Sequence, residues 1–318
     1  MSRPAGVASP EGVPFCYTPL LGDNDFLRGH AYYFPFRLRT APSAKPKKND
    51  DGNGEFGSIL HEAAPAYGTS GGKTIANFST PVRAYLANFG IKNPDSDADT
   101  AALIWLHALA IGFAPAYLAE NADGIRQDWP RIPLPDSKKL LLASVELGRQ
   151  VAALLDTEAP VPGVTDGKIR PDLKTIADLH FTGEMDFRVI AGWGHAGKEG
   201  VTMPGKGKML TRAYRSEEEP DKPGLALLGK STHDIYLNDT AYWRNVPEKV
   251  WDFTIGGYQV LKKWLSYREH TLLGRPLTTD EAREVTHTAR RLAALILLQP
   301  ELDANYQRVK AACYSWPA

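Results

Sequence analysis

Cysteine is scarce in this sequence. Its 318 residues include two cysteines, Cys16 and Cys313, which stand near opposite ends of the chain. Thiols so far apart in sequence give neither the disulfide framework of a small secreted domain nor the closely spaced ligands of a cysteine zinc site. The sequence therefore predicts a protein of a reducing compartment, the cytoplasm.

An excess of charge of either sign is also missing. The 37 lysines and arginines balance 37 aspartates and glutamates, so the formal net charge is zero. This balance excludes a polybasic protein, and any nucleic-acid site must be a local patch on a neutral body. The hydrophobic fraction of 43% excludes a chain that is disordered throughout, because it matches the fraction found in globular proteins.

Long hydrophobic runs are few. The stretch from Ala101 to Leu118 has 18 residues without a formal charge, which is the lower limit for a membrane-spanning helix. It contains six alanines and Pro115, and proline interrupts a helix. We interpret it as a buried, proline-interrupted core helix and expect no membrane contact. Residues 1–14 lack the apolar core of a secretion signal.

Catalytic signatures are absent too. The segment Gly68-Thr-Ser-Gly-Gly-Lys-Thr74 does not have the glycine spacing of a phosphate-binding loop. The eight histidines include no pair four residues apart, the spacing that places two zinc ligands on one helix face. No Gly-x-Ser-x-Gly elbow, nuclease Glu-x-Lys core or methyltransferase Asn/Asp-Pro-Pro-Tyr/Phe tetrapeptide stands out. The sequence predicts no catalytic residue, no metal site and no cofactor in this chain.

Helical patterns precede a region of short strands. Apolar residues recur at three- and four-residue spacing over 97–121, with Asp99 as the candidate cap, and again up to about Asp156. The proline-rich segment Trp129–Pro135 is incompatible with a regular helix and joins the two as a stiff extended connector. This arrangement predicts a helical hairpin.

The remaining elements complete a mixed architecture. A short helix is expected over 80–89, and the C-terminal part is expected to form helices over 256–270 and 277–310, the latter opened by a capping box from Thr278 to Glu281. Short alternating or aromatic runs predict strands over 31–39, 185–190, 209–214 and 234–237. The fold class is α+β, with the helical hairpin and C-terminal helices around a strand-rich, irregular middle.

Shifts in composition suggest three segments. Residues 1–30 are expected to form a flexible N-terminal segment, residues 31–160 to hold a strand, a long loop and the helical hairpin, and residues 161–318 to hold the strand-rich region with the C-terminal helices.

Basic residues concentrate in one glycine-rich stretch of the middle region. The stretch from Lys198 to Arg215 contains five cationic residues and a single acidic one, Glu199. Such a stretch suits contact with phosphates, although a solvated hairpin would have the same composition.

A second basic segment, 250–268, combines aromatic, glycine and lysine residues. A helix beginning near Gly257 would bury a stripe over 260–265 and present Gln259, Lys262, Lys263 and Ser266 on its other face. A Gly-Gly helix entrance would also leave free N–H groups that bind phosphate. An ordinary amphipathic surface helix remains the alternative.

At this segment the sequence resembles the C-terminal target-recognition region of type ISP restriction-modification enzymes, which carry the segment Gly-Gly-Tyr-Gln-Val-Leu-Lys-Lys-Trp-Leu. The resemblance covers most of 30–316, while the nuclease, ATPase and methyltransferase parts of the family are missing from this chain. The matching segments occur in the family's order: Ala31–Arg39, Ala76–Ser79, Ile104–Leu134, Trp251–Arg268 and Thr278–Tyr306.

The resemblance implies sequence-specific binding of double-stranded DNA, which would position an adenine-N6 methyltransferase supplied by a partner, together with a helicase-nuclease. Basic loops over 37–48 and 198–215 would contact phosphates. The expected DNA-binding residues are Lys206, Lys208, Arg212, Arg215, Gly256, Gly257, Tyr258, Gln259, Lys262 and Lys263. Two alternatives stay open: a non-catalytic scaffold that docks a methyltransferase or helicase, and an unrecognised hydrolase.

Overall fold

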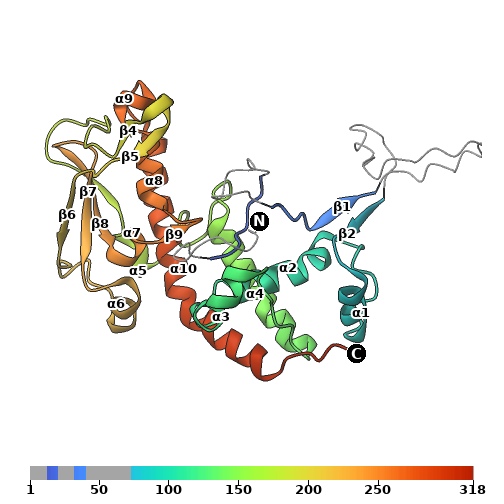
Figure 1. Ribbon diagram of the computed structural model, residues 1–318. Helices are drawn as coiled ribbons and strands as arrows, with labels where there is room; N and C mark the ends of the chain where they lie inside the picture. The colour runs from blue at the N-terminus through green and yellow to red at the C-terminus, as the bar shows by residue number, and fades with distance from the viewer. Residues whose placement is uncertain (1–12, 21–31, 41–72, 318) are drawn as a thin grey trace, which may run out of the picture. The chain divides into compact units, whose positions relative to one another are not determined.

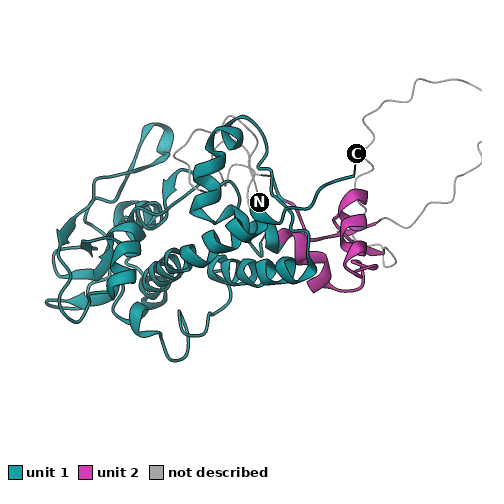
Figure 2. Ribbon diagram, turned by 90° about the horizontal axis from the view of Figure 1, so that it is seen from below, with its two compact units in different colours: residues 1–33, 106–318 teal, residues 34–105 magenta. Residues whose placement is uncertain are grey.

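The computed structural model describes residues 13–20, 32–40 and 73–317. The chain divides into two compact units, one made of residues 1–33 and 106–318 and the other of residues 34–105 (Figure 2). The predicted basic residues Lys45, Lys47 and Lys48 and the glycine-rich segment from Gly68 to Gly72 lie outside the described residues.

The described part of the smaller unit is organised around Asp95. The Oδ1 atom of Asp95 accepts hydrogen bonds from the Ala76 N–H at 2.7 Å and from Arg83 Nη2 at 2.9 Å. These bonds join an antiparallel pair of strands to the helix predicted over 80–89. The elements are β1 (Arg37–Arg39), β2 (Thr74–Ala76), α1 (Thr80–Asn88) and the first half of α2 (Ala98–Gly112).

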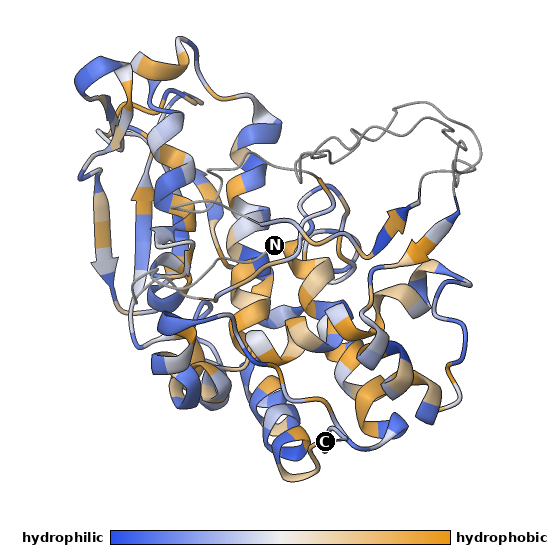
Figure 3. Cartoon of the chain, turned by 45° about the vertical axis from the view of Figure 1, so that its right-hand side comes forward, coloured by the Kyte–Doolittle hydropathy of each residue, from blue (hydrophilic) through white to orange (hydrophobic). Residues whose placement is uncertain are grey.

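A 33-residue helix, α10 (Thr279–Ala311), runs through the larger unit (Figure 1). Hydrophobic residues gather along its middle and hydrophilic residues at its ends (Figure 3). Its start confirms the predicted capping box: the Glu281 N–H donates to Thr278 Oγ1 at 3.2 Å, and the Thr278 N–H donates to Glu281 Oε2 at 2.8 Å. These two bonds satisfy N–H groups that a helix leaves open at its first turn.

Polar bonds fix α10 to the helices beside it. Arg291 Nη1 donates to a carbonyl near the end of α4 (Lys138–Leu155) at 2.8 Å. Asp303 Oδ1 accepts from a backbone N–H in the first turn of α3 (Pro115–Gln127) at 2.8 Å. As predicted, residues 130–134 between α3 and α4 form no helix.

His107, one of the eight histidines of the sequence, is a core residue. It is completely buried, and its ring nitrogens lie 2.8 Å from Ser144 Oγ and 2.9 Å from the Pro133 carbonyl oxygen. Burial lowers the pKa of His107 to about 4, so the ring is neutral at neutral pH. Its two hydrogen bonds join α2, α4 and the connector.

The helix expected over 97–121 is divided at residues 113–114. The proline at Pro115 starts α3, and α2 and α3 meet at an angle of 93°. Among the described residues no single helix combines the length and apolarity needed to cross a membrane, although this bent pair reaches that length together. The cap of α2 is Asp97 rather than the expected Asp99, because Asp97 Oδ1 accepts the Thr100 N–H at 2.7 Å.

A four-stranded antiparallel sheet forms the other half of the larger unit. Its strand order is β3-β8-β7-β6. Ile235 and Trp243 are paired in register and buried, and Trp243 Nε1 donates to a carbonyl of α10 at 3.1 Å. One face of the sheet therefore packs toward α10. The strands are β3 (Asp178–Phe181), β6 (Met209–Arg212), β7 (Thr232–Tyr236) and β8 (Ala241–Pro247).

Short elements complete the unit. They are α5 (Pro171–Lys174), α6 (Lys222–Leu228), α7 (Glu248–Trp251), α8 (Val260–Tyr267), α9 (His270–Leu273), β4 (Gly194–Ala196), a 3-10 turn (Lys198–Gly200), β5 (Thr202–Pro204), β9 (Thr254–Ile255) and β10 (Tyr258–Gln259). The α+β class predicted from the sequence is confirmed.

The strand predicted over 185–190 is wrong. Asn238 Nδ2 donates to the carbonyl oxygens of Asp186 and Arg188 at 2.9 and 3.0 Å, and Arg188 pairs with Asp186 at 2.8 Å. A side chain thus satisfies backbone groups that a neighbouring strand would otherwise bind. Alternating hydropathy cannot reveal that a side chain takes the place of a strand partner, because that side chain is about 50 positions away in the sequence.

Candidate nucleic-acid interface

The two basic segments expected to bind DNA lie beside each other in the larger unit. The β4–β5 hairpin packs on α8, and the contact is so close that a Cβ on Gly194 would lie 1.9 Å from the Ser266 carbonyl oxygen. Buried Glu269 accepts the N–H groups of Gly192 and Trp193 at 3.2 and 2.8 Å, which holds the start of the hairpin against α9. Figure 1 shows β4, β5, α8 and α9 together at one end of the sheet.

Three lysines of this region carry uncompensated charge. Lys198 and Lys206 are exposed at the two ends of the strand β5, and Lys262 is half-buried on α8. Among the described residues none of the three has an ion-pair partner within 4 Å or a hydrogen-bonded side-chain ammonium. Free ammonium groups on a protein of zero net charge form a local site for anions.

Lys263, unlike these three lysines, lies against aromatic rings. Its Nζ lies 4.6 Å from the ring centroid of Tyr258 and 4.5 Å from that of Tyr267. Both rings are substantially exposed, at 39% and 50%. Cation–π attraction on both sides places the ammonium between two aromatic faces. We call Lys198, Lys206, Lys262, Lys263, Tyr258 and Tyr267 the basic surface.

The expected Gly-Gly helix entrance is a β-turn instead. Gly256 and Gly257 have φ values of 60° and 83° and connect β9 to β10, in which Tyr258 pairs with Ile255. Positive φ at both central residues is typical of a two-residue hairpin loop, and Gly-Gly between strand-like residues signals one. Helix α8 therefore begins at Val260, so the glycines present no helix N-terminus.

Two further expectations for this segment are corrected. Ser266, expected on the outer face of the helix, is completely buried and donates to the Lys263 carbonyl at 2.8 Å. The Gln259 side chain donates to Asp252 Oδ1 at 3.0 Å, so its amide is bound to the loop before β9.

Arg212 belongs to a buried ion network on the sheet. Its guanidinium nitrogens lie 2.6 Å from Glu218 Oε2 and 2.8 Å from Asp234 Oδ1, while Arg244 Nε lies 3.1 Å from Glu218 Oε1. Although burial opposes ionisation, the hydrogen bonds from Arg212 hold the pKa of Glu218 below its ordinary value. Arg212 is thus occupied by two carboxylates in this structure. These ion pairs join β6 to β7 and to the loop that carries Glu218.

The other two predicted cations of this stretch lie outside the ion pairs of the network. Lys208 Nζ is 2.7 Å from Asp239 Oδ1 and 4.8 Å from the ring centroid of Tyr236. Arg215 is exposed, and its N–H donates to Glu218 Oε2 at 3.2 Å.

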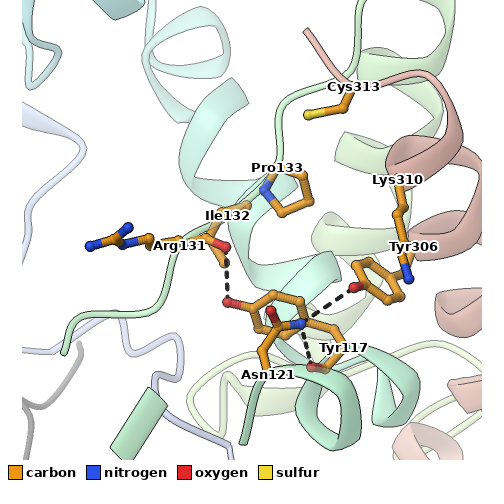
Figure 4. Close-up of a pocket in the computed structure, with 8 residues that line it drawn as sticks. All are labelled: Tyr117, Asn121, Arg131, Ile132, Pro133, Tyr306, Lys310 and Cys313. Atoms are coloured by element: carbon orange, nitrogen blue, oxygen red, sulfur yellow. Dashed lines mark hydrogen bonds between the residues drawn. The ribbon is translucent and has the colours of Figure 1, made fainter. Parts of the chain in front are cut away.

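A separate pocket of about 320 Å³ lies between α3, α10 and the connector (Figure 4). Its polar groups bond to one another: the Tyr117 hydroxyl donates to the Arg131 carbonyl at 3.1 Å, and Asn121 Nδ2 donates to the Tyr117 carbonyl at 2.9 Å. Burial raises the pKa of Tyr117 to about 12, which keeps this hydroxyl a donor. Asn121 Nδ2 also donates to the Tyr306 hydroxyl at 3.3 Å, which joins α3 to α10.

A protein-family model described as the Type ISP C-terminal specificity domain matches residues 7–295. The match covers most of the chain, and the chain therefore belongs to this family. The family resemblance read from the sequence is confirmed. No curated protein matches the chain.

Three solved structures are similar to it. A nuclease-deletion mutant of the Type ISP restriction-modification enzyme LlaGI with a DNA substrate mimic has a TM-score of 0.35 and 15% identity over 65% of this chain. The ATP-dependent Type ISP enzyme LlaBIII bound to DNA has a TM-score of 0.45 and 14% identity over 89%. The DrdV–DNA complex has a TM-score of 0.38 and 13% identity over 71%. This chain spans 16%, 14% and 19% of those chains.

Proposed function

We propose that this chain recognises a specific sequence in double-stranded DNA for a type ISP-like restriction-modification system in the bacterial cytoplasm. The observation that carries the proposal is the basic surface: Lys198 and Lys206 flank a strand that packs on α8, and α8 carries Lys262 and Lys263, on a molecule without net charge. Lysines of this kind contact phosphates and set the register of a protein on the duplex.

The covalent chemistry is assigned to partner modules. In this proposal an adenine-N6 methyltransferase and a helicase-nuclease act on DNA that this chain has selected and positioned. The chain itself contributes binding energy and sequence preference. The membership in a specificity-domain family supports this division of labour.

Direct binding of labelled duplexes tests the proposal. The wild-type chain should bind DNA at low salt, and the triple variant Lys198→Ala, Lys206→Ala, Lys262→Ala should bind at least 10-fold more weakly, because three phosphate contacts are lost. A charge-matched control, Lys138→Ala, Lys139→Ala, Lys168→Ala, removes three exposed lysines of the same unit and should bind as wild type does.

Specificity is tested by selecting bound sequences from random duplexes. A recurring site in the selected pool would support target recognition. A wild-type chain that ignores duplex DNA in dilute buffer would contradict the proposal and favour a scaffold that docks other proteins.

A further inference from the structure

Register places four side chains in one row across the outer face of the four-stranded sheet. Tyr236 on β7 pairs with Tyr242 on β8, and Tyr242 pairs with His180 on β3. The Tyr236 N–H donates to the Lys208 carbonyl at 3.0 Å, which brings Lys208 to the same level. Paired residues of antiparallel strands share a face. This is the face opposite to buried Trp243.

The four side chains stack on one another. Lys208 Nζ covers the Tyr236 ring at 4.8 Å, the Tyr236 and Tyr242 rings lie 5.0 Å apart at 23°, and the Tyr242 and His180 rings lie 5.8 Å apart at 26°. His180 Nε2 closes the far end at 2.9 Å from Asp178 Oδ2. We call Lys208, Tyr236, Tyr242 and His180 the aromatic row. Stacking restricts its rings before any ligand arrives.

The row leaves hydrogen-bonding groups unused. Rings that stack between neighbouring strands stand on edge on the sheet, so their polar tips point away from it. Within the part of the chain that the structure describes, the hydroxyls of Tyr236 and Tyr242 have no hydrogen-bond partner. Further along the same face the polar side chains are already paired, because Arg212, Arg244 and Glu218 neutralise one another.

The segments that carry the aromatic row and the basic surface are in contact. Trp193 Nε1 donates to the Tyr236 carbonyl at 2.7 Å, and Gly207 packs so closely on the Trp193 ring that a Cβ would lie 2.1 Å from it. Trp193 directly precedes β4, and Lys206 stands two residues before Lys208. A duplex held by the basic surface would therefore border the row.

We propose that the aromatic row reads base edges in the major groove of that duplex. The proposal rests on the proposed function and names the groups that supply its specificity. Four neighbouring strands at about 4.8 Å spacing give the row a length of about 14 Å. The major groove is about 12 Å wide, so the row would lie along the groove, with the two central hydroxyls toward the bases. Phenol hydroxyls both donate and accept, so they suit base edges. The Lys208 ammonium is bound by Asp239 at 2.7 Å, so the two hydroxyls are the groups that would read the bases.

The double variant Tyr236→Phe, Tyr242→Phe tests the row, because it removes both hydroxyls and retains the stacked rings. We expect an unchanged melting temperature and unchanged binding of unrelated duplexes. Binding of the sequence selected by the wild type should weaken about 5- to 100-fold, the product of two lost hydrogen bonds. Tyr32→Phe, an exposed tyrosine elsewhere in the same unit, is the matched control and should bind as wild type does.

A double-mutant cycle that combines altered protein with altered DNA identifies the base that the hydroxyls contact. Replacing each purine of the selected site by its 7-deaza analogue removes one acceptor from the major groove. At one position the analogue should weaken wild-type binding several-fold and leave the double variant unaffected, because both changes remove the same hydrogen bond.

Three outcomes would overturn the inference. The first is a double variant that selects the same sequence with the same affinity as the wild type. The second is an equal loss of affinity for selected and unrelated duplexes, which would make the row a phosphate-binding element. The third is a wild-type chain that binds no duplex, which would overturn the proposed function as well; the first two leave it standing.

Discussion

At the scale of single residues, Glu218 is the carboxylate that neutralises two arginines on the sheet. Its carboxylate is fully buried between Arg212 and Arg244, and Asp234 holds the other side of Arg212. Both arginines carry charge that is already compensated. Arginine content alone therefore overstates the positive surface available to DNA.

Removing this carboxylate should strongly destabilise the fold. We expect Glu218→Ala to lower the free energy of unfolding by about 3 kcal/mol, the lower end of the range for breaking a buried ion pair, because Arg212 then keeps only Asp234 and Arg244 only its 3.8 Å contact with Asp178. Urea denaturation measures the effect. The neighbouring exposed residue provides a control, since Glu219→Ala should change the free energy by less than about 0.5 kcal/mol. Equal effects of the two substitutions would contradict the network's structural role.

At the scale of elements, the packing of helices depends on particular glycines. In α4, a Cβ on Gly148 would lie 1.8 Å from the Leu106 carbonyl oxygen of α2, whereas a Cβ on Gly124 in α3 would meet no atom within 4 Å. The absence of a side chain at Gly148 lets the backbones of α2 and α4 touch.

The two glycines should respond to alanine with opposite signs. Gly148→Ala should destabilise the protein by about 1–3 kcal/mol through overpacking. Gly124→Ala should stabilise it by about 0.5–1 kcal/mol, because alanine is the better helix former at an exposed site. Thermal unfolding of both variants checks the pair. A stabilising Gly148→Ala would show that α2 and α4 do not cross as closely as described.

The capping box of α10 should make stability depend on pH. Hydrogen bonds from Arg275 and from the Thr278 N–H lower the pKa of Glu281 to about 2. A carboxyl whose folded pKa lies below its unfolded value near 4.5 stabilises the fold above that value, and the contribution disappears as the pH falls toward 2.

Glu281→Gln should therefore lower stability at pH 7 by about 0.5–2 kcal/mol, the range for losing a cap, and the difference from wild type should vanish near pH 2. Melting temperatures measured between pH 7 and pH 2 test this. Glu301→Gln, an exposed residue of the same helix, should give curves parallel to those of the wild type.

At the scale of the whole molecule, a zero net charge makes binding depend on where the charges lie. The logarithm of DNA affinity should fall by about 0.9 per phosphate contact for each logarithmic unit of salt. The triple variant of Lys198, Lys206 and Lys262 should reduce that slope by about 2–3. The control variant of Lys138, Lys139 and Lys168 should keep it. An equal salt dependence of affinity in all three proteins would show that the basic surface does not contact DNA.

The sequence by itself determined the elements that depend on local chemistry. Thr278 and Glu281 cap α10 because their side chains and the helix N–H groups lie within one turn. The apolar spacing of α4 and the prolines of the connector are likewise local signals. The lysine-rich segment around Lys262 carried the family resemblance, since a family motif is a property of sequence alone.

Only the tertiary structure decided which charged and aromatic groups are free. The sequence counts Arg212 and Lys206 as equal cations, yet one is bound by Glu218 and Asp234 and the other is unpaired among the described residues. Register likewise aligned His180 with Tyr236, 56 positions away. Pairing across strands and burial of charge depend on contacts between distant segments, so no local pattern encodes them.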